Sequence, residues 1–131
     1  MFNHGKHKRS FTYVDDIVEG VIRTLDQPAT ANSEWEGMAS DPATSNAQYR
    51  IFNIGSERPV ELLRYIEVLA HRLGKKAAME MLPLQAGDVP DTEADLSVLI
   101  ESVGYRPIVW VEEGMRNFVR WYRDHYQVVE T

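Results

Sequence analysis

The 131-residue sequence contains no cysteine, no long apolar segment and no excess of positive charge, and each absence excludes a class of protein. Without cysteine there can be no disulfide framework, no thiolate metal site and no cysteine nucleophile. No apolar run approaches the roughly 20 residues needed to span a bilayer, and the first residues are not a signal peptide. The formal net charge of -6 disfavours broad attraction to nucleic acid or to an anionic membrane. We therefore expect a cytoplasmic protein that binds neither.

The residues that are present have the proportions of an ordinary globular domain. Hydrophobic residues make up 44% and charged residues 26% of the sequence, and a chain of this length can bury one modest core. Apolar residues spaced three and four apart predict helices at about residues 13–26, 59–74, 95–104 and 111–126. Short strands are expected at residues 1–4, 50–55 and 78–82. A long surface loop is expected at about residues 27–48, where apolar periodicity is lost. This order predicts a mixed α/β fold in a single domain, residues 1–131.

Residues that favour helix ends support several of these boundaries. Pro59 lies near the start of its predicted helix and Gly74 lies past its end, which is the usual asymmetry of these two residue types. Asp95 can cap the next helix, which Gly104 closes. Trp35 is a lone large aromatic in the polar loop, and such a residue usually packs back onto the fold.

Residues 9–21, RSFTYVDDIVEGV, form the most informative stretch of the sequence. Thr12 and Asp15 have the spacing of a capping box, in which two side chains satisfy backbone amides at the start of a helix. Arg9 therefore stands just before a well-defined helix start, a suitable position for a guanidinium that binds an anion. The helix that follows has one apolar face, made by Val14, Ile17, Val18, Val21, Ile22 and Leu25.

A second informative stretch, residues 82–92, has the sequence LPLQAGDVPDT. Gly87 allows a tight turn in which the backbone can approach a ligand. The Asp88 carboxylate can accept hydrogen bonds from two ribose hydroxyls. The same residues also fit a solvated turn that is followed by a helix cap. The stretch therefore indicates a ligand-binding site only in combination with the other motifs.

Taken in this order, the motifs resemble the C-terminal, substrate-binding part of the extended short-chain dehydrogenase/reductase family. This family comprises NAD-dependent nucleotide-sugar epimerases and dehydratases. The resemblance rests on Arg-Ser-Phe-Thr-Tyr-Val-Asp-Asp at residues 9–16, Gly-Asp-Val-Pro at residues 87–90, and the Ala94-Asp95 pair. Further features are similar to the UDP-glucuronate 4-epimerase branch, namely the loop leading into residues 52–55, Gln85, and the tail at residues 112–122. Departures from the family pattern are Ser10, Ala86, Glu93 and Trp110.

The resemblance implies a UDP-sugar of the UDP-glucuronate class as ligand and gives four residues a part in holding it. Arg9 and Gln85 would contact the diphosphate, Asp88 the ribose, and Phe2 would border the uracil. In the family, the sugar is oxidised at C4 with bound NAD and the hydride is returned to the opposite face. Firm binding of the UDP end, while the hexose turns, is what the C-terminal part supplies.

The resemblance also implies that the cofactor and the catalytic residues belong to a part of the family fold that this sequence lacks. Family members bind NAD through a glycine-rich turn, and no Gly-x-Gly-x-x-Gly motif occurs here. No tyrosine is followed four residues later by the lysine of the family's catalytic pair. We therefore expect a C-terminal fragment with no Rossmann core, no cofactor and no catalytic residue, which cannot interconvert UDP-glucuronate and UDP-galacturonate alone.

Other interpretations of the same residues remain open. The chain can be a free-standing nucleotide-sugar-binding or interaction module, or part of a related UDP-sugar dehydratase or decarboxylase. The basic run at residues 6–9 fits a nucleic-acid patch, but the acidic balance disfavours one. His4 and His7 have no third ligand at a matching spacing, which predicts a surface pair and no metal site. A fragment is expected to expose an apolar face, through which the chain can form a homo-oligomer.

Overall fold

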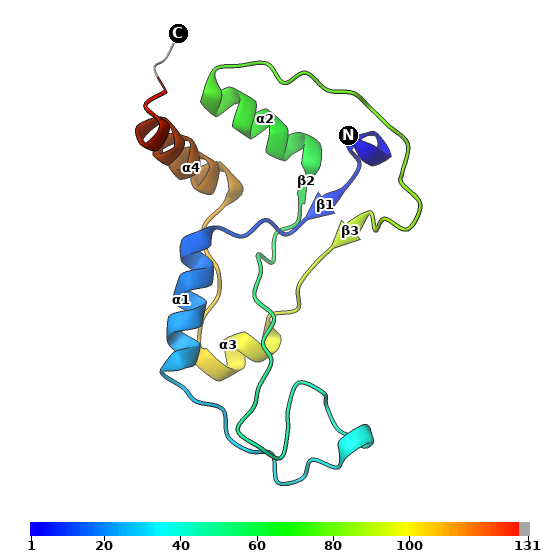
Figure 1. The fold of residues 1–131 in the computed structure, drawn as a ribbon, viewed down its shortest axis with the longest axis vertical. Helices are drawn as coiled ribbons and strands as arrows, with labels where there is room; N and C mark the ends of the chain where they lie inside the picture. Colours follow the sequence, from blue (N-terminus) through cyan, green and yellow to red (C-terminus); the bar gives the residue numbers. More distant parts are fainter. Residues whose placement is uncertain (129–131) are drawn as a thin grey trace.

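The computed structural model describes residues 1–128, which form four α-helices and a small sheet at one side of the molecule (Figure 1). The helices are α1 (Val14–Leu25), α2 (Leu62–Leu73), α3 (Ser97–Val103) and α4 (Val111–Tyr126). The strands have two residues each and are β1 (Lys8–Arg9), β2 (Val60–Glu61) and β3 (Asp91–Thr92). Two 3-10 helices complete the list, η1 (Phe2–Gly5) and η2 (Gly37–Ala39). The predicted mixed α/β class is confirmed.

The sheet joins three segments that lie far apart in the sequence. Its strand order is β2-β1-β3, with β1 antiparallel to β2 and parallel to β3. Arg9 in the central strand stands opposite Val60 on one side and Thr92 on the other. Because β2 runs directly into α2, the sheet also fixes the start of that helix (Figure 1). The sheet therefore determines where Arg9 and the turn before β3 meet.

The core consists of two separate clusters of buried side chains. One lies between α2 and α4 and contains Val68, Met115 and Val119, with Tyr65, Leu69 and Leu73 packed against it. The other contains Leu99, Val103 and Tyr105, with Phe52 and Ile54 packed against it. The segment that leaves β1 is attached to the first cluster, because the Phe11 ring stacks on Tyr65 at a centroid distance of 3.9 Å.

Helix α1 is attached to the second cluster through a buried carboxylate. Asp16 is buried, and its two oxygens accept hydrogen bonds from the Tyr105 hydroxyl at 2.9 Å and from the backbone amides of Ile108 at 3.2 Å and Val109 at 2.9 Å. A buried charge is tolerated only when it is satisfied in this way. Gly20, one turn further along, lets the helix approach Ile54 closely. The buried face of α1 is therefore made by an aspartate and a glycine.

The helix predictions are confirmed with small shifts at the ends. Gly74 and Gly104 close α2 and α3 with φ of +68° and +64°, values that suit glycine. Asp95 accepts a hydrogen bond from the backbone amide of Ser97 at 2.9 Å, and this bond lowers the pKa of Asp95. Val60 and Glu61, which the sequence pattern assigns to a helix, instead form β2.

The predicted capping box is wrong. Helix α1 begins at Val14 with Tyr13 as its N-cap, and no side-chain cap is formed. The Thr12 hydroxyl instead donates to the carbonyl of Ser10 at 3.3 Å and accepts the backbone amide of Ser56 at 3.0 Å. The hydrogen bond with Ser56, which is distant in sequence, has replaced the local capping bond that was predicted for Thr12.

The predicted strand positions are also wrong. Residues 2–5 form η1, in which Asn3 and His4 have φ of 49° and 50°. Arg50 makes a single bridge to Thr44, and residues 51–55 form no strand. Residues 78–82 run beside η1 without strand pairing, and the amide of Leu82 donates to the Met1 carbonyl at 2.8 Å.

Between α1 and β2 the chain contains no regular element longer than η2. Trp35 in this segment is half-buried and its indole nitrogen is enclosed, so the ring is partly covered, as expected. Among residues 1–128, no helix has the length and apolar character needed to cross a membrane.

Candidate functional site

The candidate site lies where β1 meets the turn that precedes β3. Residues 85–88 form this turn, which is closed by a hydrogen bond from the Asp88 amide to the Gln85 carbonyl at 3.1 Å. Gly87 has φ of +84°, a left-handed conformation that glycine adopts at low cost. The turn directs Asp88 toward Arg9, which lies on the neighbouring strand. Two residues selected from separate stretches of the sequence are therefore brought together.

Arg9 is held firmly by backbone carbonyls of its own strand and of the segment between the turn and β3. Its Nη1 donates to the carbonyls of Pro90 at 2.7 Å and Lys8 at 2.9 Å, and its Nη2 donates to the Val89 carbonyl at 2.8 Å. Nη2 also lies 3.6 Å from Oδ1 of Asp88. The two side chains are 30% and 33% exposed, so both remain accessible to a ligand. The guanidinium is thus a fixed positive charge beside the central strand of the sheet.

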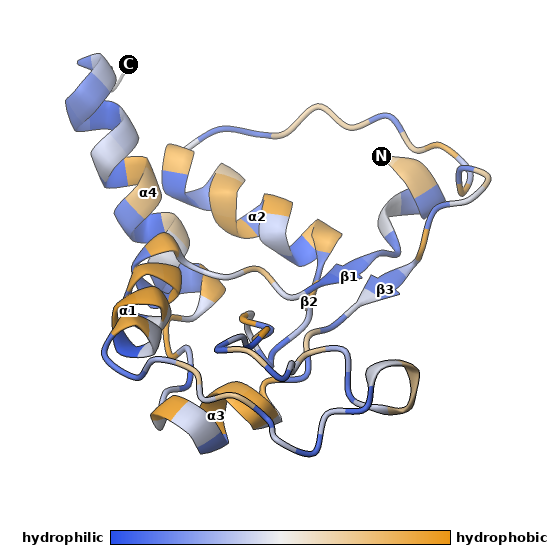
Figure 2. Ribbon diagram, turned by 60° about the horizontal axis from the view of Figure 1, so that its bottom comes forward, coloured by the Kyte–Doolittle hydropathy of each residue, from blue (hydrophilic) through white to orange (hydrophobic). Residues whose placement is uncertain are grey.

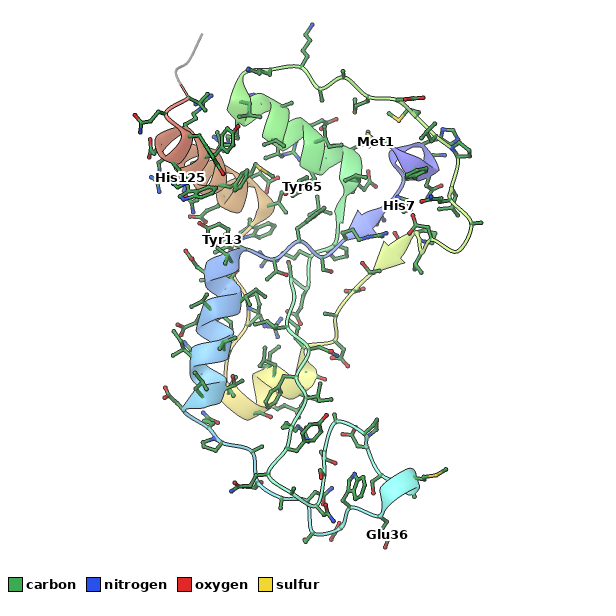
Figure 3. All side chains as sticks on the ribbon, viewed as in Figure 1. Met1, His7, Tyr13, Glu36, Tyr65 and His125 are labelled. Atoms are coloured by element: carbon green, nitrogen blue, oxygen red, sulfur yellow. The ribbon has the colours of Figure 1, made fainter. Side chains whose placement is uncertain are left out.

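His7 completes this group, and sequence reasoning missed it. Its side chain is only 5% exposed, which contradicts the predicted surface pair of His4 and His7. Its Nε2 lies 3.3 Å from Oδ2 of Asp88, outside hydrogen-bonding geometry, and finds no hydrogen-bond partner among residues 1–128. Figure 3 shows His7 beside β1 and close to β3. The signal that could have found it is its spacing of two from Arg9, which places two residues on the same side of an extended chain.

The other two predicted residues lie at the border of this group. Gln85 is exposed and shares the closed turn with Asp88. Phe2 is exposed on η1, and η1 is joined to the segment before the turn by the hydrogen bond from the His4 amide to the Leu82 carbonyl at 2.9 Å. Arg9 and Asp88 are therefore in direct proximity, whereas Gln85 and Phe2 are connected to them through the backbone.

The four cavities described in the structure are not lined by these residues. One of about 760 Å³ lies between residues 56–58, 93–96 and 106–109, and the ion pair of Glu57 with Arg106 stands beside it. An apolar cavity of about 240 Å³ lies where α1 and α4 begin. Among residues 1–128, no group of three His, Asp or Glu side chains is arranged to hold a metal ion. The Arg9–Asp88 group is thus an open surface site.

Comparison with known proteins gives the family. No protein-family model matches the chain. The chain is 48% identical over 128 residues to an uncharacterized 37.6 kDa protein of Escherichia coli O111:H-, covering 98% of this chain and 38% of that protein. It is 37% identical over 132 aligned positions to a probable UDP-glucuronate 4-epimerase of Rhizobium meliloti (strain 1021), covering 100% of this chain and 39% of the relative.

The structural comparison agrees. A UDP-glucuronic acid 4-epimerase from Bacillus cereus, solved with UDP-glucuronic acid and NAD, matches with a TM-score of 0.70 and 25% identity, covering 96% of this chain and 35% of that one. Over nearly its whole length the chain is similar to proteins of the NAD-dependent epimerase family. It corresponds to the C-terminal part of the extended short-chain dehydrogenase/reductase epimerases. It spans less than two fifths of the length of these two curated relatives in the family.

Proposed function

We propose that this chain supplies the UDP-sugar-binding portion of a nucleotide-sugar epimerase that interconverts UDP-glucuronate and UDP-galacturonate. The observation that carries the proposal is the pairing of the Arg9 guanidinium with the Asp88 carboxylate at an accessible position beside the central strand of the sheet. The relatives support the substrate class, because one is named a probable UDP-glucuronate 4-epimerase and another was solved with UDP-glucuronic acid.

In this proposal Arg9 holds the diphosphate. A guanidinium has five N–H donors, and three hydrogen bonds to the carbonyls of residues 8, 89 and 90 fix its position. The remaining donors and the positive charge are available to a phosphate oxygen. Because the carbonyl bonds hold the guanidinium in place before ligand arrives, little side-chain entropy is lost on binding.

Asp88 holds the ribose. Its carboxylate has two acceptor oxygens, one near Arg9 and one near His7, and two vicinal hydroxyls can donate to such a pair. Gln85 lies on the same turn and offers an amide to the diphosphate. Phe2 is placed beside the uracil, where an exposed ring can stack on a base. The four residues would together grip the nucleotide end of the substrate.

These residues would assist the reaction by holding the nucleotide end of the substrate, although none of them contacts the reacting carbon. Binding energy from a remote part of a substrate can position the reacting part. The sugar ring, which these residues leave free, can then present either face to the catalytic groups. In the proposal, NAD and those catalytic groups belong to the larger portion that the longer relatives contain and these 131 residues lack.

The test is UDP binding measured by calorimetry on this chain with Asp88→Ala and Asp91→Ala. Asp91 is an exposed carboxylate in β3, three residues from Asp88, and so controls for the loss of charge. We expect Asp88→Ala to weaken UDP binding about tenfold, equivalent to about 1.4 kcal/mol, and Asp91→Ala to leave it unchanged. Equal affinities for all three proteins would contradict the assignment of Asp88. The same pair of changes in the intact Rhizobium meliloti relative provides the comparison in a full-length protein.

A further inference from the structure

Among residues 1–128, the two buried polar side chains, Asp16 and His7, are satisfied very differently. Asp16 accepts three hydrogen bonds. The Nε2 atom of His7 is enclosed and finds no hydrogen-bond partner within the same range of residues. A buried polar group without a partner lowers stability, and such a group in a folded protein calls for an explanation. The atom that Nε2 faces is Oδ2 of Asp88, at 3.3 Å.

The backbone fixes His7 and Asp88 beside each other. The His7 carbonyl accepts the Leu62 amide at 2.9 Å, and the next amide, that of Lys8, donates to the Pro90 carbonyl at 3.1 Å. The turn that carries Asp88 is closed by its own hydrogen bond at 3.1 Å. Strands β1 and β3 pair in parallel, lie side by side and are both hydrophilic (Figure 2). The imidazole is therefore held beside the carboxylate in a polar part of the fold.

The carboxylate of Asp88 stands between two protein side chains, which approach different oxygens. Arg9 Nη2 lies 3.6 Å from Oδ1, and His7 Nε2 lies 3.3 Å from Oδ2. Each carboxylate oxygen can accept two hydrogen bonds. One acceptor position on each oxygen is thus directed toward the protein, and one on each is left for a ligand. Two vicinal hydroxyls need this arrangement if each is to donate to its own oxygen.

The two members of the His7–Asp88 pair differ in their access to a ligand. The Asp88 side chain is 33% exposed, whereas that of His7 is 6% exposed. A nucleotide can therefore reach the carboxylate, while the imidazole lies behind it next to β1 (Figure 3). Any effect of His7 on a bound nucleotide must act through the position of Asp88.

We propose that His7 is a positioning residue, whose Nε2–H donates to Oδ2 of Asp88 when nucleotide is bound and so turns both carboxylate oxygens toward the ribose. Hydrogen bonds at binding sites are often long or poorly aligned without ligand and tighten in the complex. The consequence is selectivity for UDP over 2′-deoxyuridine diphosphate, because a site that accepts from a hydroxyl disfavours the analogue that lacks it. This inference rests on the proposed function, in which Asp88 holds the ribose.

Three variants test this role. His7→Met removes the N–H and fills the space with a flexible apolar side chain, whereas His7→Gln keeps an N–H donor. His71→Met is the matched control, because it makes the same change at an exposed histidine of α2. In urea denaturation, His7→Met should have an unfolding free energy no lower than that of the parent. The reason is that a buried nitrogen without a partner is lost, while Asp88 keeps its access to water.

Calorimetry then gives the affinity of each protein for UDP and for 2′-deoxyuridine diphosphate. We expect the parent to bind UDP about tenfold more tightly, as the loss of one hydrogen bond implies. In His7→Met this preference should fall to about twofold, mainly through weaker UDP binding. His7→Gln and His71→Met should keep it. If His7 only filled space, its replacement would weaken the binding of both nucleotides by the same factor, and that result would overturn the inference.

The outcomes separate this inference from the proposed function. If the parent binds neither nucleotide, the proposed function fails and the inference fails with it. If the parent binds UDP but shows no preference over the deoxy analogue, the inference alone fails. It also fails alone if His7→Met keeps the full preference, or if His7→Gln loses the preference as His7→Met does.

A measurement on the parent chain decides the matter if His7→Met does not fold. The imidazole Nε2–H signal of His7 is followed by NMR during titrations with UDP and with 2′-deoxyuridine diphosphate. We expect a saturable shift with UDP and a smaller one with the deoxy analogue at equal occupancy. A signal that stays in place while UDP saturates the chain, or that moves equally with both nucleotides, would overturn the inference.

Discussion

At the scale of single residues, two adjacent aspartates in α1 have opposite environments. Asp16 is buried and accepts three hydrogen bonds, whereas Asp15 is exposed. Asp16→Ala would leave a buried hydroxyl and two amides without an acceptor, so we expect a loss of about 3 kcal/mol in unfolding free energy. Asp15→Ala removes only a favourable interaction with the helix dipole and should cost less than about 1 kcal/mol. Urea denaturation followed by tryptophan fluorescence measures both, and equal losses would contradict the role of Asp16.

Tyr105, which donates a hydrogen bond to Asp16, makes the unfolding free energy depend on pH. Burial of the Tyr105 hydroxyl, followed by its hydrogen bond to Asp16, raises the pKa of Tyr105 from 10.0 to about 12. Below pH 10 the tyrosine is protonated in both the folded and the unfolded chain. Between pH 10 and 12 the unfolded chain loses this proton while the folded chain keeps it. The contribution of Tyr105 to the unfolding free energy therefore falls as pH rises through this window.

The variant Tyr105→Phe isolates this contribution. It removes the titrating group and also the hydrogen bond to Asp16, so the variant should be less stable than the parent at pH 8. Its unfolding free energy should then fall less steeply than that of the parent between pH 9 and pH 11. Urea denaturation at a series of pH values gives both slopes. Parallel slopes would show that Tyr105 does not titrate differently in the two states.

At the scale of elements, Gly20 sets how closely α1 approaches the segment that carries Ile54. A Cβ at position 20 would lie 2.3 Å from Cδ1 of Ile54. Gly→Ala in an exposed helix stabilises by up to about 1 kcal/mol, but here we expect Gly20→Ala to destabilise the fold by about 1–3 kcal/mol. In an Ile54→Ala background this cost should shrink, giving a coupling of about 1 kcal/mol in a double-mutant cycle. An additive cycle would show that the two residues do not meet.

The elements also show what the sequence can predict. The four helices were predictable because their apolar residues repeat with helical spacing, and because Gly74 and Gly104 mark two ends. Strands of two residues carry no alternation, and each is defined by a partner distant in sequence, so β1, β2 and β3 were not placed correctly. The capping box failed for a related reason, because the amide of Ser56 occupies the Thr12 hydroxyl. Local patterns predicted local structure and missed pairings between remote segments.

At the scale of the whole molecule, the sequence predicted which residues form the site better than how they are held. Arg9 and Asp88 were selected through motifs, and the fold brings them within 3.6 Å. Two of the three carbonyl bonds that fix Arg9 come from residues 89 and 90, and the sequence contains no sign of these two bonds. His7 was assigned to the surface, whereas the fold buries it beside Asp88, a residue 81 positions away in the sequence. The exposed stripe of α1 was visible as a pattern, but its outward direction required the structure.

The measurement that tests the central claim most directly is a UDP titration of the isotopically labelled chain, followed through backbone amide NMR signals. The central claim is that these 131 residues carry the nucleotide end of the substrate pocket. We expect the signals of Arg9, Asp88 and Phe2 to shift in a saturable manner, with the signals of α1 and of residues 27–48 unmoved. A well-dispersed spectrum in which the signals of residues 7–9 and 85–92 do not respond to UDP would contradict the claim.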